Sequence, residues 1–341
     1  MSTMGVGVIG AGWVAGEHIK AFHQNPNAEL VAIAGLESDR ERTEAAMAGT
    51  DCVFTTRYQD LLENPDIQVV SLATPPDFHR EHAVAAAKAG KHLMLEKPMA
   101  TNVSDAKEIR DAVAAAGVKS VVSFVLRWNP LFEIIKAQLA DNTIGKVFYG
   151  EVDYFHGVGP WYGQYTWNIT KRAGVSSLLS AGCHAMDALR WFMGGEVVEV
   201  TQYATRGDGP DFKPYEYNPT TVTMCRFSDG RLGKVTSCIE CIQPYVFGIN
   251  LVGTDGTIRN NRVFSKTKFP GQTTWADVPT ILPDSGDVSH HPFVHEVDHF
   301  IDCILSDRES HACIADAFKT HEVCYAADLS GEQGGAVKLP L

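Results

Sequence analysis

The chain has 341 residues and a mass of 37.2 kDa, more than a single hydrophobic core usually supports, so two domains are expected. Its formal net charge of -12 at pH 7 argues against nonspecific binding to nucleic acid or to an anionic membrane. No apolar run reaches the roughly 18 residues that a membrane helix needs, so a small molecule is the expected partner.

The expected location is the cytoplasm. The first strand-like run, Met4 to Ile9, begins almost at the initiating methionine and leaves no room for a signal peptide. Eight cysteines scattered along a long chain are typical of free thiols in a reducing compartment. Cys238 and Cys241 form a CxxC pair without a second pair at zinc-finger spacing, which favours structural cysteines, with a metal or redox role as the alternative.

From Met4 to about Val122, short apolar runs alternate with alanine-rich amphipathic stretches. Strands are expected at VGVIG, ELVAIAG, VVSLAT, HLMLE and SVVSF, and helices at Trp13 to Asn25, Asp39 to Ala48, His79 to Ala89 and Ser104 to Ala116. This alternation predicts a doubly wound parallel sheet, which is an α/β Rossmann domain over residues 1–123.

Beyond about Phe124, a helix-like stretch is followed mainly by runs of strands. The helix is Leu131 to Leu139, and the strand-like runs are VFYGEVDYFH, VVEVTQYAT, TTVTMCRFSDG, RLGKVTSCIECI and FGINLVGTDGTI. The pattern predicts an α+β domain over residues 124–341 with a large, mostly antiparallel open sheet. One face of this sheet is expected to carry Lys171 to Trp191. Phe293 to Leu305 and Asp316 to Ala327 are expected to be helices that pack back at the domain junction.

A nucleotide fingerprint opens the first half. VGVIGAGWVAG places Gly10, Gly12 and Ala15 in a GxGxxG/A pattern directly after a strand and before a helix. The first glycine permits a tight turn, the second lets the backbone approach a pyrophosphate, and the third small residue lets helix and strand pack closely. The helix N-terminus then supplies N–H groups and a positive dipole end for phosphates. Dinucleotide binding is therefore expected here.

The end of the second strand usually carries an acid for the adenosine ribose. That position holds Gly35, and the nearest acid is Glu37. Glu37 could accept the two ribose hydroxyls and favour NAD, whereas Arg40 or Arg42 could bind the 2′-phosphate of NADP. NAD is the preferred cofactor, NADP is the alternative, and solvated residues at the start of a helix are the other interpretation.

Three further motifs follow in order: ATPPDFH at 73–79, GKHLMLEKPMA at 90–100, and RWNP after the fifth strand. With the fingerprint, they make the chain resemble the glucose-fructose oxidoreductase/inositol dehydrogenase/MocA (Gfo/Idh/MocA) family over nearly its whole length. The resemblance implies cofactor contacts, besides those of the fingerprint glycines and Glu37, from Trp13, Val14, Thr74, Pro75, His79, Glu96, Lys97 and Arg127.

The family's Glu-Lys-Pro motif is matched by Glu96, Lys97 and Pro98. The resemblance implies that Lys97 lies beside the nicotinamide, where it helps to move the proton of the substrate hydroxyl, and that the peptide before the proline is cis. Alcohol oxidation needs such a group, because the cofactor takes the hydride and not the hydroxyl proton. A partly desolvated lysine beside a cationic nicotinamide is expected to have a lowered pKa and to act as an acid/base.

The family's pattern on the first helix of the second domain resembles GGGxxxDxGxHxxD. Gly174, Gly182, His184 and Asp187 match it, whereas Ser180 replaces the aspartate and Val175 and Ser176 interrupt the glycine run. On a helix, residues 180 and 184 share a face. The resemblance makes His184 a second catalytic candidate, less basic without the aspartate's charge, with a packing histidine as the alternative. Ser180 and Asp187 become candidate substrate contacts.

Aromatic residues gather in the first strand and loop of the second half. They are Tyr154, His156, Trp161, Tyr162, Tyr165 and Trp167. The family often binds polyols and sugars in this region, so Tyr154, Trp161 and Trp167 are expected to contact a carbohydrate, with a local core as the alternative. In SHHPFVHEVDHF, His295 and His299 stand four apart beside His290, His291 and Glu296, but the HExxH order is missing and no metal is expected.

The resulting interpretation is an NAD(P)-dependent oxidoreductase that transfers a hydride between nicotinamide and a hydroxyl-bearing carbon of a sugar, polyol or carbohydrate derivative. One alternative is a redox-neutral glycosidase or lyase that retains NAD and acts through a transient keto-sugar. Another is a nucleotide-binding sensor without turnover, which the serine at position 180 keeps open. The bare face of an open sheet, together with the family resemblance, predicts a homodimer or homotetramer.

Overall fold

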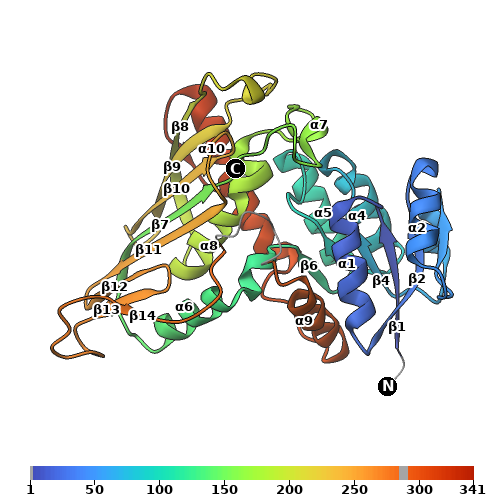
Figure 1. The fold of residues 1–341 in the computed structure, drawn as a ribbon, viewed down its shortest axis with the longest axis horizontal. Helices are drawn as coiled ribbons and strands as arrows, with labels where there is room; N and C mark the ends of the chain where they lie inside the picture. Colours follow the sequence, from blue (N-terminus) through green and yellow to red (C-terminus); the bar gives the residue numbers. More distant parts are fainter. Residues whose placement is uncertain (1–2, 284–290) are drawn as a thin grey trace. The chain divides into compact units, whose positions relative to one another are not determined.

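The computed structural model describes residues 3–283 and 291–341 (Figure 1). The chain divides into two compact units, Met1–Phe124 with Pro292–Lys319 and Val125–His291 with Thr320–Leu341. Pro292–Lys319 lies in the sequence range expected for the second domain, 124–341, but it belongs to the first unit. The reason is that helix α9 (Phe293–Leu305) packs against helix α1 (Trp13–Gln24).

The first unit is built on a six-stranded sheet in the order β3-β2-β1-β4-β5-β6. All neighbouring strands run parallel, which confirms the doubly wound sheet. The strands are β1 (Met4–Ile9), β2 (Ala28–Ala34), β3 (Val53–Thr55), β4 (Val69–Leu72), β5 (His92–Leu95) and β6 (Ser120–Val122). This order reverses direction beside β1, and ligands of such sheets bind at the carboxyl ends of the strands around that point.

Helices connect these strands, and four of them lie where the amphipathic stretches predict. The helices are α1, α2 (Arg40–Ala46), α3 (Tyr58–Glu63), α4 (His79–Lys88) and α5 (Val103–Ala116), and Figure 1 shows α4 and α5 side by side. The Asn102 side chain caps α5 by accepting a hydrogen bond from the Asp105 amide, and Gly117 ends it in the left-handed conformation. The elements β3 and α3 were not predicted, because a three-residue strand and a six-residue helix are too short to display a period.

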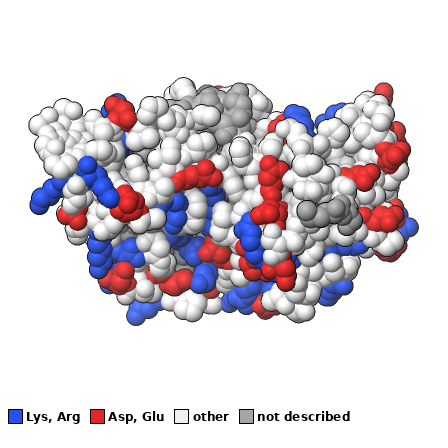
Figure 2. Space-filling model, turned by 90° about the horizontal axis from the view of Figure 1, so that it is seen from below, with Lys and Arg blue, Asp and Glu red and all other residues white. Residues whose placement is uncertain are grey.

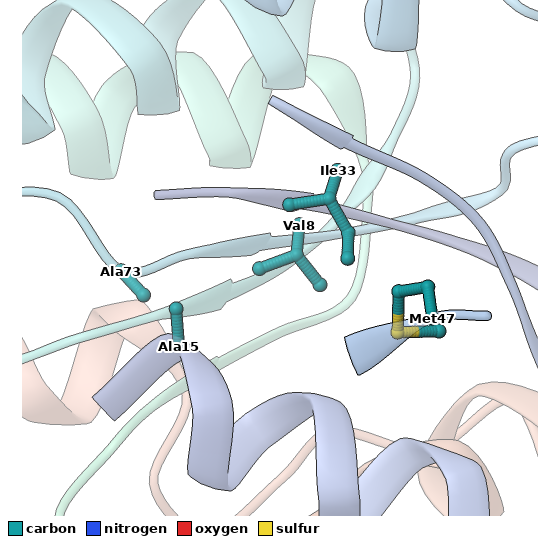
Figure 3. Packing of buried hydrophobic residues seen from close by; sticks show 5 residues of the cluster. All are labelled: Val8, Ala15, Ile33, Met47 and Ala73. Atoms are coloured by element: carbon teal, nitrogen blue, oxygen red, sulfur yellow. The ribbon is translucent and has the colours of Figure 1, made fainter. Parts of the chain in front are cut away.

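A small apolar cluster supports the turn that follows β1 (Figure 3). Val8 and Ile33 come from neighbouring strands, Ala15 from α1 and Ala73 from the loop after β4, and Met47 closes one side. Ala15 is fully buried, so the small third position of the fingerprint is needed for close contact between helix and sheet.

The second unit contains a nine-stranded sheet in the order β14-β13-β12-β11-β7-β10-β9-β8-β15. Its strands are β7 (Val147–Phe155), β8 (Val197–Thr205), β9 (Thr220–Phe227), β10 (Leu232–Cys238), β11 (Val246–Gly253), β12 (Gly256–Arg259), β13 (Arg262–Ser265), β14 (Ala276–Asp277) and β15 (Val337–Lys338). The pair β7 and β10 is parallel and the other pairs are antiparallel, which confirms a mostly antiparallel sheet.

One face of this sheet is covered by helices, and the other face exposes apolar side chains. Helix α8 (Cys183–Met193) packs against β7 and β10, and Figure 1 shows α10 (Ile314–Gln333) on the same side of the sheet. Two further helices, α6 (Pro130–Ala140) and the short α7 (Tyr165–Asn168), also belong to this unit. Along β9, buried and exposed residues alternate, and Val222 and Met224 are 39% and 41% exposed. The register sets Tyr203 of β8 opposite Val222, on the same exposed face.

Charged side chains of both signs are interspersed on the face of the molecule in Figure 2. Ion pairs among the described residues include Arg80 with Glu108 and Lys119 with Glu309. In the part of the chain that the structure describes, we find no helix with the length and apolar character needed to cross a bilayer.

Candidate active site

The fingerprint loop joins β1 to α1. Gly10 has a φ of 114°, and a Cβ there would lie 2.4 Å from the Ala73 carbonyl oxygen. This turn therefore needs glycine for its own backbone, whatever it binds. It is held to the sheet by hydrogen bonds from the Gly10 amide to the Ala34 carbonyl and from the Ala73 amide to the Ile9 carbonyl.

Gly12 differs from Gly10 in a way that tests the fit of a dinucleotide. Its backbone is extended (φ -77°, ψ -172°), which any residue adopts, and a Cβ there would meet no protein atom within 4 Å. Gly12 is the N-cap of α1 and supplies no side-chain cap, and the first turn of the helix carries no acid. The protein's own packing does not require glycine here, whereas the close approach of a pyrophosphate to the backbone and to the first-turn amides does. The residues present fit a dinucleotide.

The segment after β2 carries the groups expected near the ribose. Glu37 is exposed and pairs with Arg40, whose Nε lies 2.7 Å from Glu37 Oε1. Arg40 also pairs with Glu44 at 3.1 Å, and the Arg42 guanidinium donates to the carbonyl oxygen of Ala11 in the fingerprint loop. The hydrogen bond from Arg40 lowers the pKa of Glu37, so this carboxylate is ionised. Carboxylate and guanidinium groups are thus both present here.

His79 ties the loop after β4 to the loop after β5. Its Nε2 lies 2.8 Å from the Thr74 carbonyl oxygen and its Nδ1 lies 2.8 Å from the Pro98 carbonyl oxygen. The ring is fully buried, and burial lowers its pKa although the two carbonyls act in the opposite direction. His79 therefore links the two loops, and its direct contact with the cofactor remains a prediction.

The Glu-Lys-Pro turn directly follows β5. The Lys97–Pro98 peptide is cis, as the resemblance implies, and Lys97 is half-buried. The Lys97 amide donates to Glu96 Oε2 at 3.1 Å, and the Glu96 amide donates to the Leu72 carbonyl. Because β1, β4 and β5 are neighbours in a parallel sheet, the fingerprint, the Thr74 loop and the Lys97 turn end at the same edge.

In the second unit, the segment before α8 is a π turn, Leu178–Gly182. The regular α-helix begins only at Cys183, so Ser180 lies in the π turn and His184 in the α-helix. The motif had suggested that both residues lie on one regular helix. Gly182 lies against β10, where a Cβ would come within 2.5 Å of the Ser237 Cβ, and Ser237 Oγ donates to the Ser177 carbonyl. Single π turns inside helices are frequent at functional sites.

His184 lies in the first turn of α8 among aromatic rings. Its ring is stacked with Tyr154 at a centroid distance of 6.5 Å and lies 6.3 Å from the ring of His291. Tyr154 in turn contacts Tyr245 edge-on, and its hydroxyl lies 3.2 Å from His156 Nδ1. Burial raises the pKa of Tyr154 well above its ordinary value, so its phenol is neutral and can donate a hydrogen bond.

A family model described as an oxidoreductase family with an NAD-binding Rossmann fold matches residues 4–124. A second model, the Gfo/Idh/MocA C-terminal domain, matches residues 132–259, and the two segments together cover most of the chain. The chain belongs to the Gfo/Idh/MocA family of oxidoreductases. Its first unit accordingly contains the family's NAD-binding Rossmann domain.

Curated members of the Gfo/Idh/MocA family match this chain over nearly its whole length. The scyllo-inositol 2-dehydrogenase (NAD(+)) of Bacillus subtilis is 25% identical and covers 97% of this chain and 95% of its own. The D-apiose dehydrogenase of Paraburkholderia graminis is 26% identical over 97% of this chain and 88% of its own. A levoglucosan dehydrogenase solved in complex with NADH shares the fold with a TM-score of 0.88, at 22% identity over 99% of this chain and 100% of its own.

Two residues of this Gfo/Idh/MocA chain that are predicted to contact ligands are bound to each other. Asp187 and Arg127 form a buried ion pair, with Nε to Oδ2 at 2.7 Å and Nη2 to Oδ1 at 2.6 Å. Both carboxylate oxygens and the guanidinium fork are therefore used inside the protein. The substrate role of Asp187 and the cofactor role of Arg127 remain predictions, and the pair itself indicates that Asp187 anchors α8.

The predicted aromatic contacts separate into different environments. Tyr154 is buried beside His184, whereas Trp161 is 66% exposed and packs edge-on against Phe212. Trp167 is half-buried on α7. Ser180 lies beside Tyr217, where burial raises the pKa of the phenol and a hydrogen bond with Ser180 acts in the opposite direction.

The candidate metal residues do not form a site within residues 3–283 and 291–341. No group of three or more His, Cys, Asp and Glu residues that could hold a metal ion is found there. His295 is exposed and Glu296 is fully buried on α9, while His290 lies outside the described residues. All eight cysteines are free thiols, and Cys241 Sγ lies 3.8 Å from the Cys238 carbonyl oxygen at the end of β10.

Several residues that surround the predicted site residues have no motif of their own in the sequence. Tyr217 and Tyr245 flank Ser180 and Tyr154, and His291 was considered only as a metal ligand. Their signal was weak because tyrosines in strand and turn regions are common core residues. In the first unit, His18 and Ser123 lie against Glu96, and no local motif announced either of them.

Proposed function

We propose that the protein is an NAD-dependent dehydrogenase that transfers a hydride between the nicotinamide and a hydroxyl-bearing carbon of a sugar, a polyol or a related carbohydrate derivative. The observation that carries the proposal is the Glu96-Lys97-Pro98 turn at the carboxyl end of β5, on the same sheet edge as the fingerprint. The curated relatives support the substrate class, because their names specify an inositol and apiose.

Lys97 is proposed as the principal acid/base. Bound NAD would supply the hydride acceptor at its nicotinamide and cannot itself remove the hydroxyl proton. The amine of Lys97, a half-buried residue, takes that proton during oxidation when it is deprotonated and returns it during reduction. The Lys97 amide donates to Glu96 Oε2 at 3.1 Å, which fixes the main chain from which the long lysine side chain extends.

His184 is proposed to hold or assist the same hydroxyl, with Ser180 as a hydrogen-bonding neighbour. Tyr154, Trp161 and Trp167 are proposed to contact the apolar faces of a carbohydrate. Cofactor contacts are proposed for the fingerprint residues Gly10, Gly12, Trp13 and Val14, for Glu37, and for Thr74, Pro75, His79, Glu96, Lys97 and Arg127. In this scheme residues 1–123 bind the dinucleotide and residues 124–341 bind the substrate.

We further propose a cytoplasmic homodimer or homotetramer. The eight free thiols are compatible with a reducing compartment. The exposed apolar side chains on β8, β9 and β10 (Tyr203 78%, Val222 39%, Met224 41%, Leu232 44%) support association, since a monomer rarely leaves such a face in water. Sedimentation analysis of wild type and Met224→Glu tests this point, and a monomeric wild type would contradict it.

The experiment for the proposed activity compares wild type with Lys97→Met. A panel of sugars, polyols and glycosides is assayed for NADH formation and, in parallel, for release of an aglycone. We expect NADH formation with at least one sugar or polyol and a decrease of roughly 10²- to 10⁴-fold in kcat for Lys97→Met, with NAD affinity retained. Aglycone release without net NADH would instead support redox-neutral chemistry. Wild-type turnover in Lys97→Met would remove lysine from the mechanism.

A further inference from the structure

A buried chain of polar side chains runs through the first unit beneath the Lys97 turn. Glu96 Oε1 lies 3.1 Å from His18 Nε2 on α1, and His18 Nδ1 lies 2.8 Å from Ser71 Oγ on β4. On its other side, Glu96 is hydrogen-bonded to Ser123, which follows β6, and Ser123 Oγ lies 2.9 Å from Glu296 Oε2 on α9. Glu296, His18 and Ser71 are fully buried, and Ser123 is 1% exposed.

The number of hydrogens in this chain indicates that one of the two carboxyl groups beside Ser123 is protonated. Ser123 has one hydroxyl hydrogen and lies between two carboxyl groups, so it cannot donate to both. If both groups were ionised, one carboxylate oxygen would face the Ser123 oxygen without a hydrogen between them. A protonated Glu296 removes the conflict: its O–H donates to Ser123, and Ser123 donates to Glu96.

The surroundings favour the proton on Glu296 and not on Glu96. Glu96 has three groups within hydrogen-bond distance that can donate to it, His18, the Lys97 amide and Ser123, whereas Glu296 Oε1 has no hydrogen-bond partner within the described residues. Burial, followed by the charge of Glu96, raises the pKa of Glu296 well above its ordinary value. Burial also acts to raise the pKa of Glu96, but His18, Lys97 and Ser123 outweigh it and lower that pKa.

Helix α9, which carries Glu296, also packs against α1, the helix that follows the fingerprint loop. Phe293, in the first turn of α9, packs against Trp13 and His18 of α1 with ring centroids 6.4 Å and 5.5 Å apart. Asn25, at the end of α1, donates to Asp298 of α9 at 2.6 Å. One helix from the C-terminal part of the chain thus supports both the fingerprint helix and, through Ser123, the carboxylate under Lys97.

We propose that Glu296 is a positioning residue for Lys97. Its protonated carboxyl group donates a hydrogen bond to Ser123, Ser123 donates to the Glu96 carboxylate, and that carboxylate accepts from the Lys97 amide. This inference rests on the proposed function, in which Lys97 moves the substrate proton. A carboxylate fixed by three donors keeps the Glu96-Lys97-Pro98 turn in one conformation, and a base must be held within hydrogen-bond reach of the proton that it takes. Loss of the Glu296 donor leaves Ser123 free to turn away from Glu96.

The decisive comparison is Glu296→Gln against Glu296→Leu. The glutamine amide can donate to Ser123 as the carboxylic acid does, whereas leucine fills a similar volume and donates nothing. We expect Glu296→Leu to lower kcat roughly 10- to 100-fold with little change in the KM for NAD, and Glu296→Gln to restore most of that loss. Equal rates in Glu296→Leu and wild type, or an equal loss in both variants, would overturn the proposal.

Ile301→Ala is the matched control for the packing of α9. Ile301 is buried on the same helix at 1% exposure, and its truncation leaves a cavity without touching the polar chain. We expect it to lower stability while kcat is retained; a loss of kcat as large as that of Glu296→Leu would mean that α9 packing and not the donor matters. If Glu296→Leu does not fold, Ser123→Ala interrupts the same chain and should lower kcat, and wild-type kcat in Ser123→Ala would also overturn the proposal.

A spectroscopic measurement tests the donor without any assay. The infrared difference spectrum of wild type minus Glu296→Gln at neutral pH should contain the carbonyl stretch of a protonated carboxyl group, and its absence would overturn the proposal. Lys97→Met, assayed in parallel, separates the two hypotheses. Wild-type turnover in Lys97→Met overturns the proposed function, whereas a loss in Lys97→Met with an unaffected Glu296→Leu overturns only the role of Glu296.

Discussion

Asp187 and Arg127 form a bidentate ion pair inside the second unit, with both side chains almost completely buried (3% and 2% exposed). Thr320 adds a third donor, 3.0 Å from Asp187 Oδ1. The pair joins the turn after β6 to the middle of α8, the helix that begins with Cys183 and His184. Asp187 therefore fixes the helix on which the candidate catalytic histidine lies.

We expect Asp187→Ala to lower the free energy of unfolding by roughly 3–5 kcal/mol, because Arg127 is left as a buried charge without its carboxylate. The double variant Asp187→Leu/Arg127→Met should be less destabilised, since neither charge remains. Urea unfolding of both variants measures this. Wild-type stability in Asp187→Ala, together with a raised KM for the substrate, would mean that Asp187 is a substrate contact.

Gly12→Val is expected to abolish dinucleotide binding and leave the fold intact. The backbone at Gly12 is extended and a Cβ there meets no atom beyond its chain neighbours within 4 Å, so we expect the valine to interfere with a bound pyrophosphate and not with the backbone. Gly10→Ala is the matched contrast: φ is 114° and its Cβ would lie 2.4 Å from the Ala73 carbonyl, so it should lose stability as well as binding. NAD titration and thermal unfolding compare the two. Normal NAD binding by Gly12→Val would refute this site.

The sequence was sufficient to predict the Rossmann sheet and the order of its motifs. Gly10 directly follows β1 and Lys97 stands two residues after β5, and the carboxyl ends of parallel strands lie at one edge of the sheet. Those signals are local, because each motif stands within a few residues of the strand that positions it. The alternation of buried and exposed residues along β9 is equally local, since it follows the period of two of a single strand.

The contacts that arrange the candidate site are mostly long-range and left no local signal. Arg127 and Asp187 are 60 residues apart, and Ser123 and Glu296 are 173 residues apart. The π turn at Leu178–Gly182 fits against Ser237 of β10, which a helical period within the segment does not encode. Val175 illustrates the same limit, since a φ of 63° at a β-branched residue reflects tertiary constraint and not local preference.

Glu37→Ala should weaken NAD binding about tenfold and NADP binding less, because it removes a ribose acceptor and also a charge that repels the 2′-phosphate. Glu44→Ala is the control, since Glu44 is the other partner of Arg40, at 3.1 Å. It should leave the ratio of the two dissociation constants unchanged. Calorimetric titration with both cofactors measures that ratio, and a larger loss for NADP in Glu37→Ala would reverse the assigned preference.

Asp328 of α10 is expected to make stability depend on pH. Burial raises the pKa of its carboxyl from 3.8 to about 6, opposed by hydrogen bonds from Ser176 and Gln202 and assisted by the charge of Glu332. Between these two values the unfolded chain has lost the proton that the folded protein keeps, so the free energy of unfolding falls as pH rises and levels off above about 6.

Asp328→Asn should remove that decrease, which amounts to roughly 3 kcal/mol. The amide can still accept from Gln202 and donate to Ser176, so the packing is preserved. Urea midpoints of wild type and variant at pH values from about 4 to about 8 give the comparison. Parallel pH profiles in the two proteins would show that Asp328 ionises normally in the folded state.

Ser180→Asp should restore the acid that the family pattern has before the histidine, and with it a stronger base at His184. A carboxylate near the imidazole stabilises its charged form, so the pKa of His184 should rise by roughly 1–2 units and the acid limb of kcat/KM should move to higher pH. Ser180→Asn has nearly the same shape without the charge and should leave that limb in place.

The same measurement decides whether His184 takes part in the chemistry. If it holds or assists the substrate hydroxyl, His184→Ala lowers kcat/KM while NAD affinity stays unchanged, because the phosphate contacts lie in the fingerprint loop. In the His184→Ala background, Ser180→Asp should then lose its effect on the pH profile, since the group whose pKa it raises is gone. Full activity and an unaltered profile in His184→Ala would make the stacking with Tyr154, at 6.5 Å, a packing contact and leave Lys97 to carry the proton alone.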